Sequence, residues 1–161
     1  MSKSGFAVRT AAVAALAVGA AAVTGSSALA SGPVTVRASI SSVGFGAQFA
    51  AQISPGAPAD SARGVFSAQV ALGPLPLLGV AGPVTCMQVT KDAVGVFYPI
   101  AQSSLPLLAG PPPKGVLFSV DFNAAGRATA VSFLPLPVPQ LSSCAPLPGL
   151  LPASGTVSVT G

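Results

Sequence analysis

Strict alternation of apolar and polar residues constrains the fold of this chain more than any other feature. In residues 34–40, Val34, Val36, Ala38 and Ile40 are separated by single polar residues. A period of two places successive side chains on opposite faces of an extended strand. The same pattern predicts strands at residues 34–40, 45–53, 65–72, 84–90, 93–100, 116–122, 128–134 and 156–160. Eight short strands punctuated by Gly and Pro predict an all-β fold, either a single antiparallel β-sandwich or a small eight-stranded barrel.

The predicted inner faces of these strands hold most of the large side chains. They include six phenylalanines: Phe45, Phe49, Phe66, Phe118, Phe122 and Phe133. Rings of this size could fill the interior of a small barrel completely. We therefore expect a solid core rather than a cavity, although an open barrel that carries a small apolar ligand stays an alternative.

The N-terminal segment has the three parts of a secretory signal peptide. Lys3 and Arg9 supply the positive charge, residues 11–23 form a run of small apolar side chains, and residues 28–30 read Ala-Leu-Ala. An apolar run of this length is too short to span a bilayer, which takes about 20 residues. Because Pro and Gly interrupt every later apolar run, we expect no transmembrane span. The prediction is a signal peptide over 1–30, followed by a single secreted all-β domain over 31–161.

Two cysteines, Cys86 and Cys144, lie in the predicted secreted domain. In an oxidising compartment the expected state of such a pair is a structural disulfide. A reactive thiol is the alternative, but the chain has no C-x-x-C motif, no His and no clustered cations that would lower a thiol pKa. We therefore predict a Cys86–Cys144 disulfide.

The chain lacks most groups that proteins use for catalysis. It contains no His, no Glu and no Trp, and its only acids are Asp60, Asp92 and Asp121. No catalytic or metal-binding motif is present, so we expect neither an enzyme nor a cofactor. Without a basic run, nucleic-acid binding also lacks its usual electrostatic footprint. Only 6% of residues are charged, against about 25% in a typical domain, so the surface must consist largely of uncharged polar groups.

The predicted connections fall into two kinds. Short polar turns hold the charged residues Asp60, Arg63, Lys91, Asp92 and Arg127. Longer connections at 73–83, 101–115 and 135–155 are rich in Pro and Leu. If successive strands run antiparallel, these connections alternate between the two ends of the domain. The sequence thus predicts a charged end and an apolar end, with the disulfide at the apolar end.

The predicted interaction surface is this apolar end. Its candidate residues are Leu75, Leu77, Leu78, Leu105, Leu107, Leu108, Leu136, Val138, Leu147, Leu150 and Leu151. These side chains either fold back to plug the open end or form a contact surface, because monomers rarely expose large apolar patches. The contact could be made with another copy, an unknown partner protein or an envelope surface. Stiff Pro-rich segments present side chains at low entropic cost.

One segment resembles a known group of proteins. Residues 82–100, GPVTCMQVTKDAVGVFYPI, contain a G-x-V-T-C-[LM]-x-V strand followed by a turn and an apolar strand. This segment, the later KGVLFSVDFN, the single downstream Cys144 and the closing SGTVSVTG are similar in order to small secreted actinobacterial β-proteins of unknown function. The resemblance covers roughly residues 64–161. It implies a secreted β-fold with one disulfide, and it implies no activity.

Overall fold

The computed structural model describes residues 32–70, 78–103 and 113–161. The predicted signal peptide lies outside these residues. The described part is almost entirely β-structure, with one short 3-10 helix, η1 (Ala59–Ser61). Its strands are β1 (Val34–Ser42), β2 (Phe45–Ile53), β3 (Arg63–Val70), β4 (Leu78–Val84), β5 (Cys86–Val89), β6 (Ala93–Pro99), β7 (Gln102–Ser103), β8 (Gly115–Phe122), β9 (Ala128–Leu136) and β10 (Leu151–Thr160). The predicted all-β fold is confirmed.

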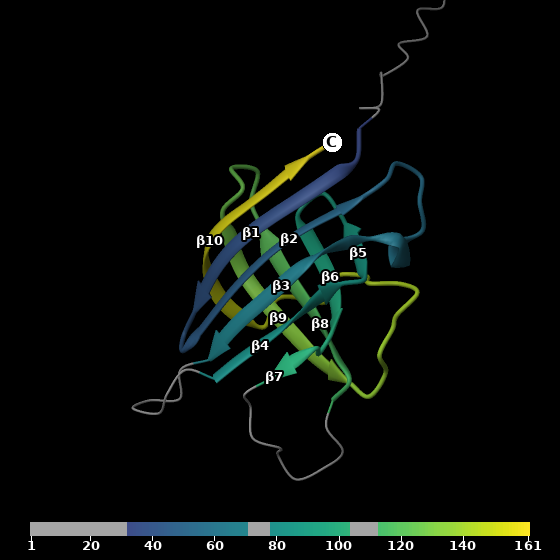
Figure 1. The fold of residues 1–161 in the computed structure, drawn as a ribbon. Coiled ribbons are helices and arrows are strands. Elements are labelled where there is room, and N and C mark those ends of the chain that lie inside the picture. Colours follow the sequence, from purple (N-terminus) through teal and green to yellow (C-terminus); the bar gives the residue numbers. More distant parts are fainter. Residues whose placement is uncertain (1–31, 71–77, 104–112) are drawn as a thin grey trace, which may run out of the picture.

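The strands form one antiparallel sheet that curls into a nearly closed barrel (Figure 1). Their order is β5-β6-β8-β9-β10-β1-β2-β3-β4-β7. Only Thr85 separates β4 from β5, and only residues 100–101 separate β6 from β7, so the ten described strands fill eight positions. The N–H of Thr85 donates to Phe97 O at 3.0 Å, and the N–H of Ala101 donates to Ala81 O at 3.2 Å. These bonds join the two ends of the sheet, so the architecture is the barrel rather than the sandwich.

The alternation in the sequence sets which side chains fill the barrel. Val36, Ala47, Phe49 and Phe66 are buried as predicted. The registers of β1–β2 and β2–β3 keep these inward residues opposite one another, for example Phe49 opposite Phe66. Because a slip of one residue would turn each apolar set toward water, the pattern itself selects this register.

Aromatic rings pack through the centre of the barrel. Phe66 stacks on Tyr98 with ring centroids 3.9 Å apart, and its edge meets Phe118 at 5.2 Å. Phe49 adds contacts to Phe66 at 6.3 Å and to Phe118 at 6.2 Å. Pairs at these separations contribute about 0.5–1.5 kcal/mol each beyond their buried area. The rings therefore form the solid centre that the sequence led us to expect.

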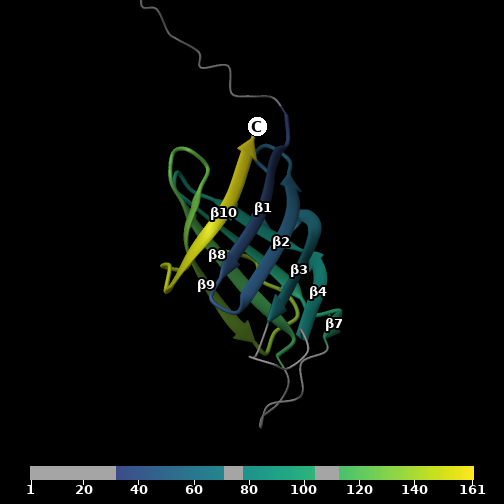
Figure 2. The same ribbon diagram turned by 90° about the vertical axis from the view of Figure 1, so that its left-hand side faces the viewer.

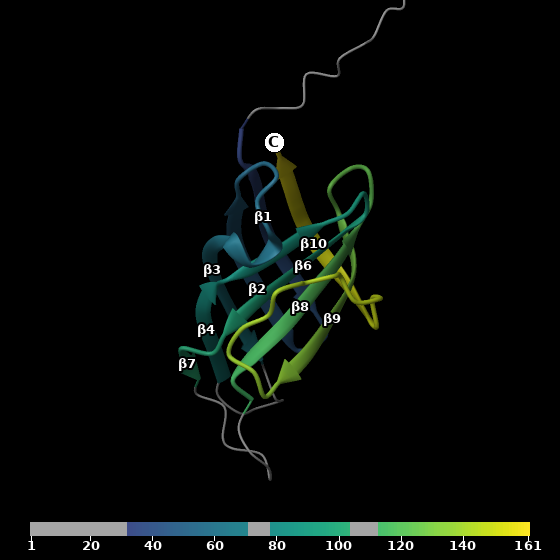
Figure 3. The same ribbon diagram turned by 90° about the vertical axis from the view of Figure 1, so that its right-hand side faces the viewer.

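A second apolar cluster lies on the outer face of β5, β6 and β8. It consists of Cys86, Phe97, Leu117 and Cys144, which are all buried. Alternation places Phe97 and Leu117 on the side away from the barrel centre, where water would normally be. These residues are dry because residues 141–150, which we call the strap, cross this face of the barrel (Figure 3).

Most predicted strands differ from the structure by one or two residues at an end, and two differ more. The segment predicted as one strand at 84–90 belongs to two, since the chain leaves β4 at Val84 and begins β5 at Cys86. The last strand is longer than predicted: residues 151–155 belong to β10 and pair with β1 and β9. Gly155 has a φ of 135°, and its missing side chain lets β1 approach closely at Ser39.

Candidate contact surface

The predicted disulfide is present between Cys86 and Cys144. Their Cα atoms are 6.1 Å apart, and neither residue is exposed to solvent. The predicted location at the apolar end is wrong, because Cys144 lies against β6 on the outer face of the barrel. A Cβ atom added at Gly95 would collide with Cys144 O. A glycine at this position lets the strap lie directly on the sheet.

Three polar side chains of the barrel hold the strap in place. Ser119 Oγ accepts a hydrogen bond from Leu147 N at 2.9 Å, and Asp121 Oδ2 accepts one from Gly149 N at 3.0 Å. Ser132 Oγ accepts one from Leu150 N at 3.0 Å and donates to Pro148 O. Ser119 and Ser132 are buried beneath the strap. The strap is thus a structural cover, tied by a disulfide near one end and by hydrogen bonds along its length.

The strap changes the interpretation of the third Pro/Leu connection, predicted at 135–155. Leu136 and Leu147 are half-buried and pack against the second apolar cluster. The sequence prediction assigned this whole connection to the apolar end, because strand counting treats a connection as a loop over a strand end. Strand counting cannot show that a long connection crosses the outer face of the barrel. The polar residues Ser119 and Ser132 on that face are the sequence signal of this path.

The two other Pro/Leu connections fall largely outside the described residues. Leu75, Leu77, Leu105, Leu107 and Leu108 belong to the segments that the structure does not describe, and Leu78 begins β4. The strand ends that flank these segments lie at one end of the barrel (Figure 1). At that end Val70, the last residue of β3, pairs with both Phe45 and Leu78.

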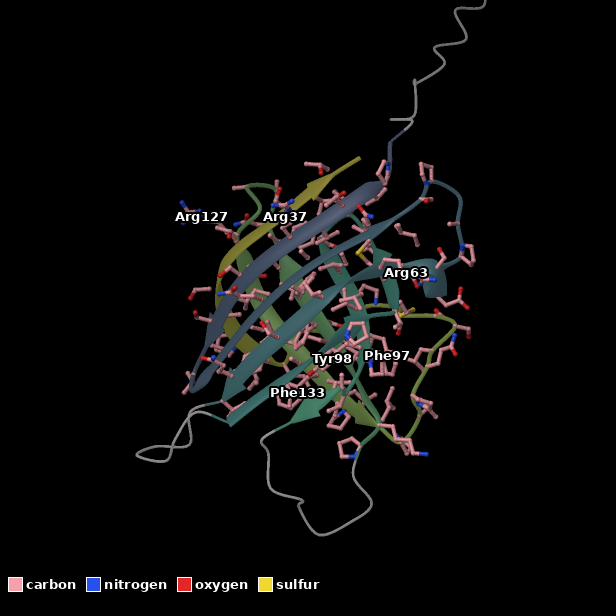
Figure 4. The ribbon with its side chains drawn as sticks, in the orientation of Figure 1. Arg37, Arg63, Phe97, Tyr98, Arg127 and Phe133 are labelled. Carbon is pink, nitrogen blue, oxygen red and sulfur yellow. A yellow bond between two sulfur atoms is a disulfide. The ribbon has the colours of Figure 1, made fainter. Side chains whose placement is uncertain are left out.

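The charged turns lie at the other end of the barrel. Phe122 N donates to Asp92 O at 2.8 Å, which joins the β5–β6 turn to the β8–β9 turn. In the β8–β9 turn, Asn123 Oδ1 accepts hydrogen bonds from Ala125 N and Arg127 N. Arg127 is placed at this end in Figure 4. The charged turns and the strand ends that flank the first two Pro/Leu connections therefore lie at opposite ends of the barrel, as the sequence predicts.

Exposed apolar side chains gather at the end that lacks the charged turns. Val43, in the β1–β2 turn, is 94% exposed, Phe133 is 49% exposed and Leu151 is 42% exposed. Phe133 stacks on Phe45 with centroids 6.1 Å apart, and Ser42 Oγ ties the β1–β2 turn to Pro152 O at 2.8 Å. We call Val43, Phe45, Phe133 and Leu151 the apolar rim. Leu151 is the first residue of β10, which runs beside β1 in Figure 2.

The rim exists because two strands part there. In the described residues β10 pairs with β9 only through Leu151 and Pro152, apart from a single bridge at Thr156. From residue 132 to the end of β9, β10 therefore does not pair with β9, which leaves the Phe133 side chain only partly covered. Sequence reasoning placed Phe133 fully in the core and did not single out Val43. The alternation could show the direction of Phe133 but not the absence of a neighbouring strand.

Two further residues of the predicted interaction surface, Val138 and Leu150, are exposed but do not belong to the rim. Val138 is at the surface after β9, and Leu150, at the end of the strap, is 79% exposed. Leu150 N donates both to Val131 O and to Ser132 Oγ, so its backbone is fixed although its side chain is free. Leu150 therefore places one further apolar side chain beside Leu151.

The described residues hold no group of three or more His, Cys, Asp or Glu that could bind a metal ion. Within the same residues, no helix is long and apolar enough to cross a membrane. Burial raises the pKa of the Tyr98 phenol above its usual range, which keeps this hydroxyl neutral in the aromatic centre.

Comparison with protein-family models, curated proteins and solved structures gives no match for this chain. The resemblance of residues 64–161 to small secreted actinobacterial β-proteins therefore stays a prediction.

Proposed function

We propose that this protein is a secreted, non-catalytic contact protein that binds another surface through its apolar rim. The observation that supports this proposal is the exposure of Val43, Phe133 and Leu151 at one end of a barrel whose centre is already filled. Side chains of this kind gain free energy when a partner covers them, about 25 cal/mol per Å² of apolar area removed from water.

The position of the rim supports the same role. The strand ends on either side of residues 71–77 lie beside it, since Val70 pairs with Phe45. The charged turns are at the opposite end, and of the charged side chains in the described residues only Lys114, directly before β8, lies at the end that holds the rim. The proposed partner is a second copy, another extracellular protein or an envelope surface, and secretion follows from the predicted signal peptide.

The alternative role as a carrier of a small apolar ligand has less support. A carrier needs an enclosed apolar volume of at least about 300 Å³. Here Phe49, Phe66, Tyr98 and Phe118 occupy the centre of the barrel at ring contact distance. We therefore do not propose this role.

Sedimentation velocity over a range of concentrations, with and without isolated envelope fragments, tests the proposal. We expect the chain from residue 31 to self-associate or to co-sediment with the fragments, and Val43→Asp to abolish this behaviour. Ala124→Asp is the control, because Ala124 is exposed in the β8–β9 turn, at the end of the barrel opposite the rim. A wild-type monomer that ignores the fragments would refute the proposal, as would equal effects of the two variants.

A further inference from the structure

The outer face of β1, β2 and β3 is largely polar apart from the exposed Val65, and no element of the described part of the chain covers it. Outward side chains of the three strands lie in cross-strand rows, such as Ser39, Gln48 and Ser67. The opposite wall of the barrel has the strap over its outer face, whereas this wall faces the viewer in Figure 1 with its strands open. The side chains of Gln48 and Ser67 are exposed and make no hydrogen bond within the described part of the chain. Their amide and hydroxyl groups are therefore free for a ligand.

A trough runs along β2 on this face. The outward residues of β2 alternate between the small Gly46 and Ala50 and the longer Gln48 and Gln52, so hollows form over the small residues. Three hollows follow the trough, with volumes of about 260, 280 and 250 Å³. The first and second share Gln48 and Ser67, and the second and third share Arg37 and Ala50. Neighbouring hollows thus adjoin one another along β2.

Two arginines border one end of this trough. Arg37 of β1 and Arg63 of β3 both line the third hollow, together with Thr35 and Gln52. Both arginines are on the strands that face the viewer in Figure 4. They lie on either side of β2, and Arg63 is opposite Gln52 while Arg37 is opposite Ala50. Strand spacing and rise place their Cα atoms about 12 Å apart, so both guanidinium groups can reach one bound chain.

No carboxylate neutralises these arginines. Arg63 Nη1 donates a hydrogen bond to Ala62 O at 2.8 Å. Within the described residues, neither arginine side chain makes any other interaction. Asp60 lines a neighbouring hollow together with Arg63 but makes no ion pair within the described residues. Asp121 is bound to the strap. The trough therefore carries two arginines without an ion-pair partner at one end, and uncharged side chains, among them the apolar Val65, along the rest.

We propose that this trough binds an acidic polysaccharide. Carboxylate groups of the polymer would bind Arg37 and Arg63 through charge-assisted hydrogen bonds. Sugar hydroxyls would bind the free groups of Gln48 and Ser67, and Val65, which is exposed, would contact the apolar edges of the sugar rings. This site lies on a side wall of the barrel, so the proposal does not depend on the apolar rim.

Other extended ligands suit the trough less well. A peptide strand binds a sheet through free backbone groups at an edge, but β1, β2 and β3 are each paired on both sides. Single-stranded nucleic acid binds through aromatic platforms and many cations, whereas the outward residues of these strands include two arginines and no aromatic ring. This face is best suited to a ligand that has many hydroxyl groups and a few negative charges.

Isothermal titration with an oligomer of galacturonic acid tests the proposal at low salt. We expect binding that weakens about tenfold in Arg37→Gln and in Arg63→Gln, and severalfold in Gln48→Ala. All three side chains are exposed, so the variants should fold. Arg127→Gln is the matched control, since Arg127 is exposed in the β8–β9 turn at the end of the barrel. Neutral dextran should bind at least tenfold more weakly than the acidic oligomer.

Several results would overturn the proposal. An absence of binding at millimolar oligomer would do so, as would an equal loss of affinity in Arg127→Gln. Binding that depends on Arg37 but not on Gln48 would show a simple anion site rather than a polysaccharide groove. Equal affinity for an oligothymidylate of the same charge would show a general preference for polyanions.

Discussion

Ser132→Ala should release the end of the strap and measurably destabilise the barrel. Ser132 Oγ accepts a hydrogen bond from Leu150 N and donates one to Pro148 O, and the residue is only 2% exposed. Removing the hydroxyl leaves Pro148 O without this donor in a partly buried position. Leu150 N keeps its second acceptor, Val131 O, at 3.1 Å. The partly buried carbonyl that loses its donor and the weakened bond together cost about 2 kcal/mol.

Urea unfolding measures this cost. With a slope of about 2 kcal/mol per M for a domain of this size, the midpoint should fall by about 1 M. Hydrogen exchange should accelerate at Leu147 and Leu150, whereas the amide of Phe49 in β2 should change only with global stability. Ser67→Ala is the control, because Ser67 is exposed and its hydroxyl makes no hydrogen bond in the described residues. An unchanged midpoint in Ser132→Ala, or an equal shift in Ser67→Ala, would refute the reasoning.

Three further changes test other parts of the structure. Gly95→Ala should cost about 1–3 kcal/mol by urea unfolding, because its Cβ would collide with Cys144 O beneath the strap; wild-type stability would mean that the strap does not rest there. Reduction of the Cys86–Cys144 disulfide, whose cysteines are 58 residues apart, should cost about 4 kcal/mol in the chain-entropy model, and coincident unfolding curves with and without reductant would contradict this. Tyr98→Phe tests the buried phenol. Because burial raises the pKa of Tyr98 in the folded protein, the phenol ionises at a lower pH in the unfolded chain. The contribution of the neutral phenol to stability is therefore complete below the unfolded pKa near 10 and is lost as the pH rises above that value. The wild type should therefore lose more stability than Tyr98→Phe between about pH 9 and 11, and parallel pH profiles would contradict this.

The sequence was sufficient to predict the class of fold and most of the barrel interior. Alternation at Val36, Phe49 and Phe66 identifies the face of each strand that is buried in the structure. The choice between sandwich and barrel was open in the sequence. It depends on the bonds from Thr85 to Phe97 and from Ala101 to Ala81, which have no local sequence signal.

The candidate surface was harder to predict. Pro and Leu composition indicates where apolar connections are, but not whether a connection covers a strand end or a sheet face. Leu147 was assigned to the end and instead contacts the second cluster beneath the strap. Phe133 was assigned to the core and is half exposed, because exposure there depends on where β10 begins to pair with β9. Both outcomes depend on long-range neighbours that a period of two does not encode.

Binding of the apolar dye anilinonaphthalene sulfonate tests the contact surface most directly. The oxidised chain from residue 31 should bind the dye in its folded state, and Phe133→Ser should lose most of the fluorescence while Val65→Ser keeps it. Both side chains are exposed, at 49% and 66%, so neither variant should open the core. A folded wild type that binds no dye, or equal fluorescence in the two variants, would contradict a functional apolar rim.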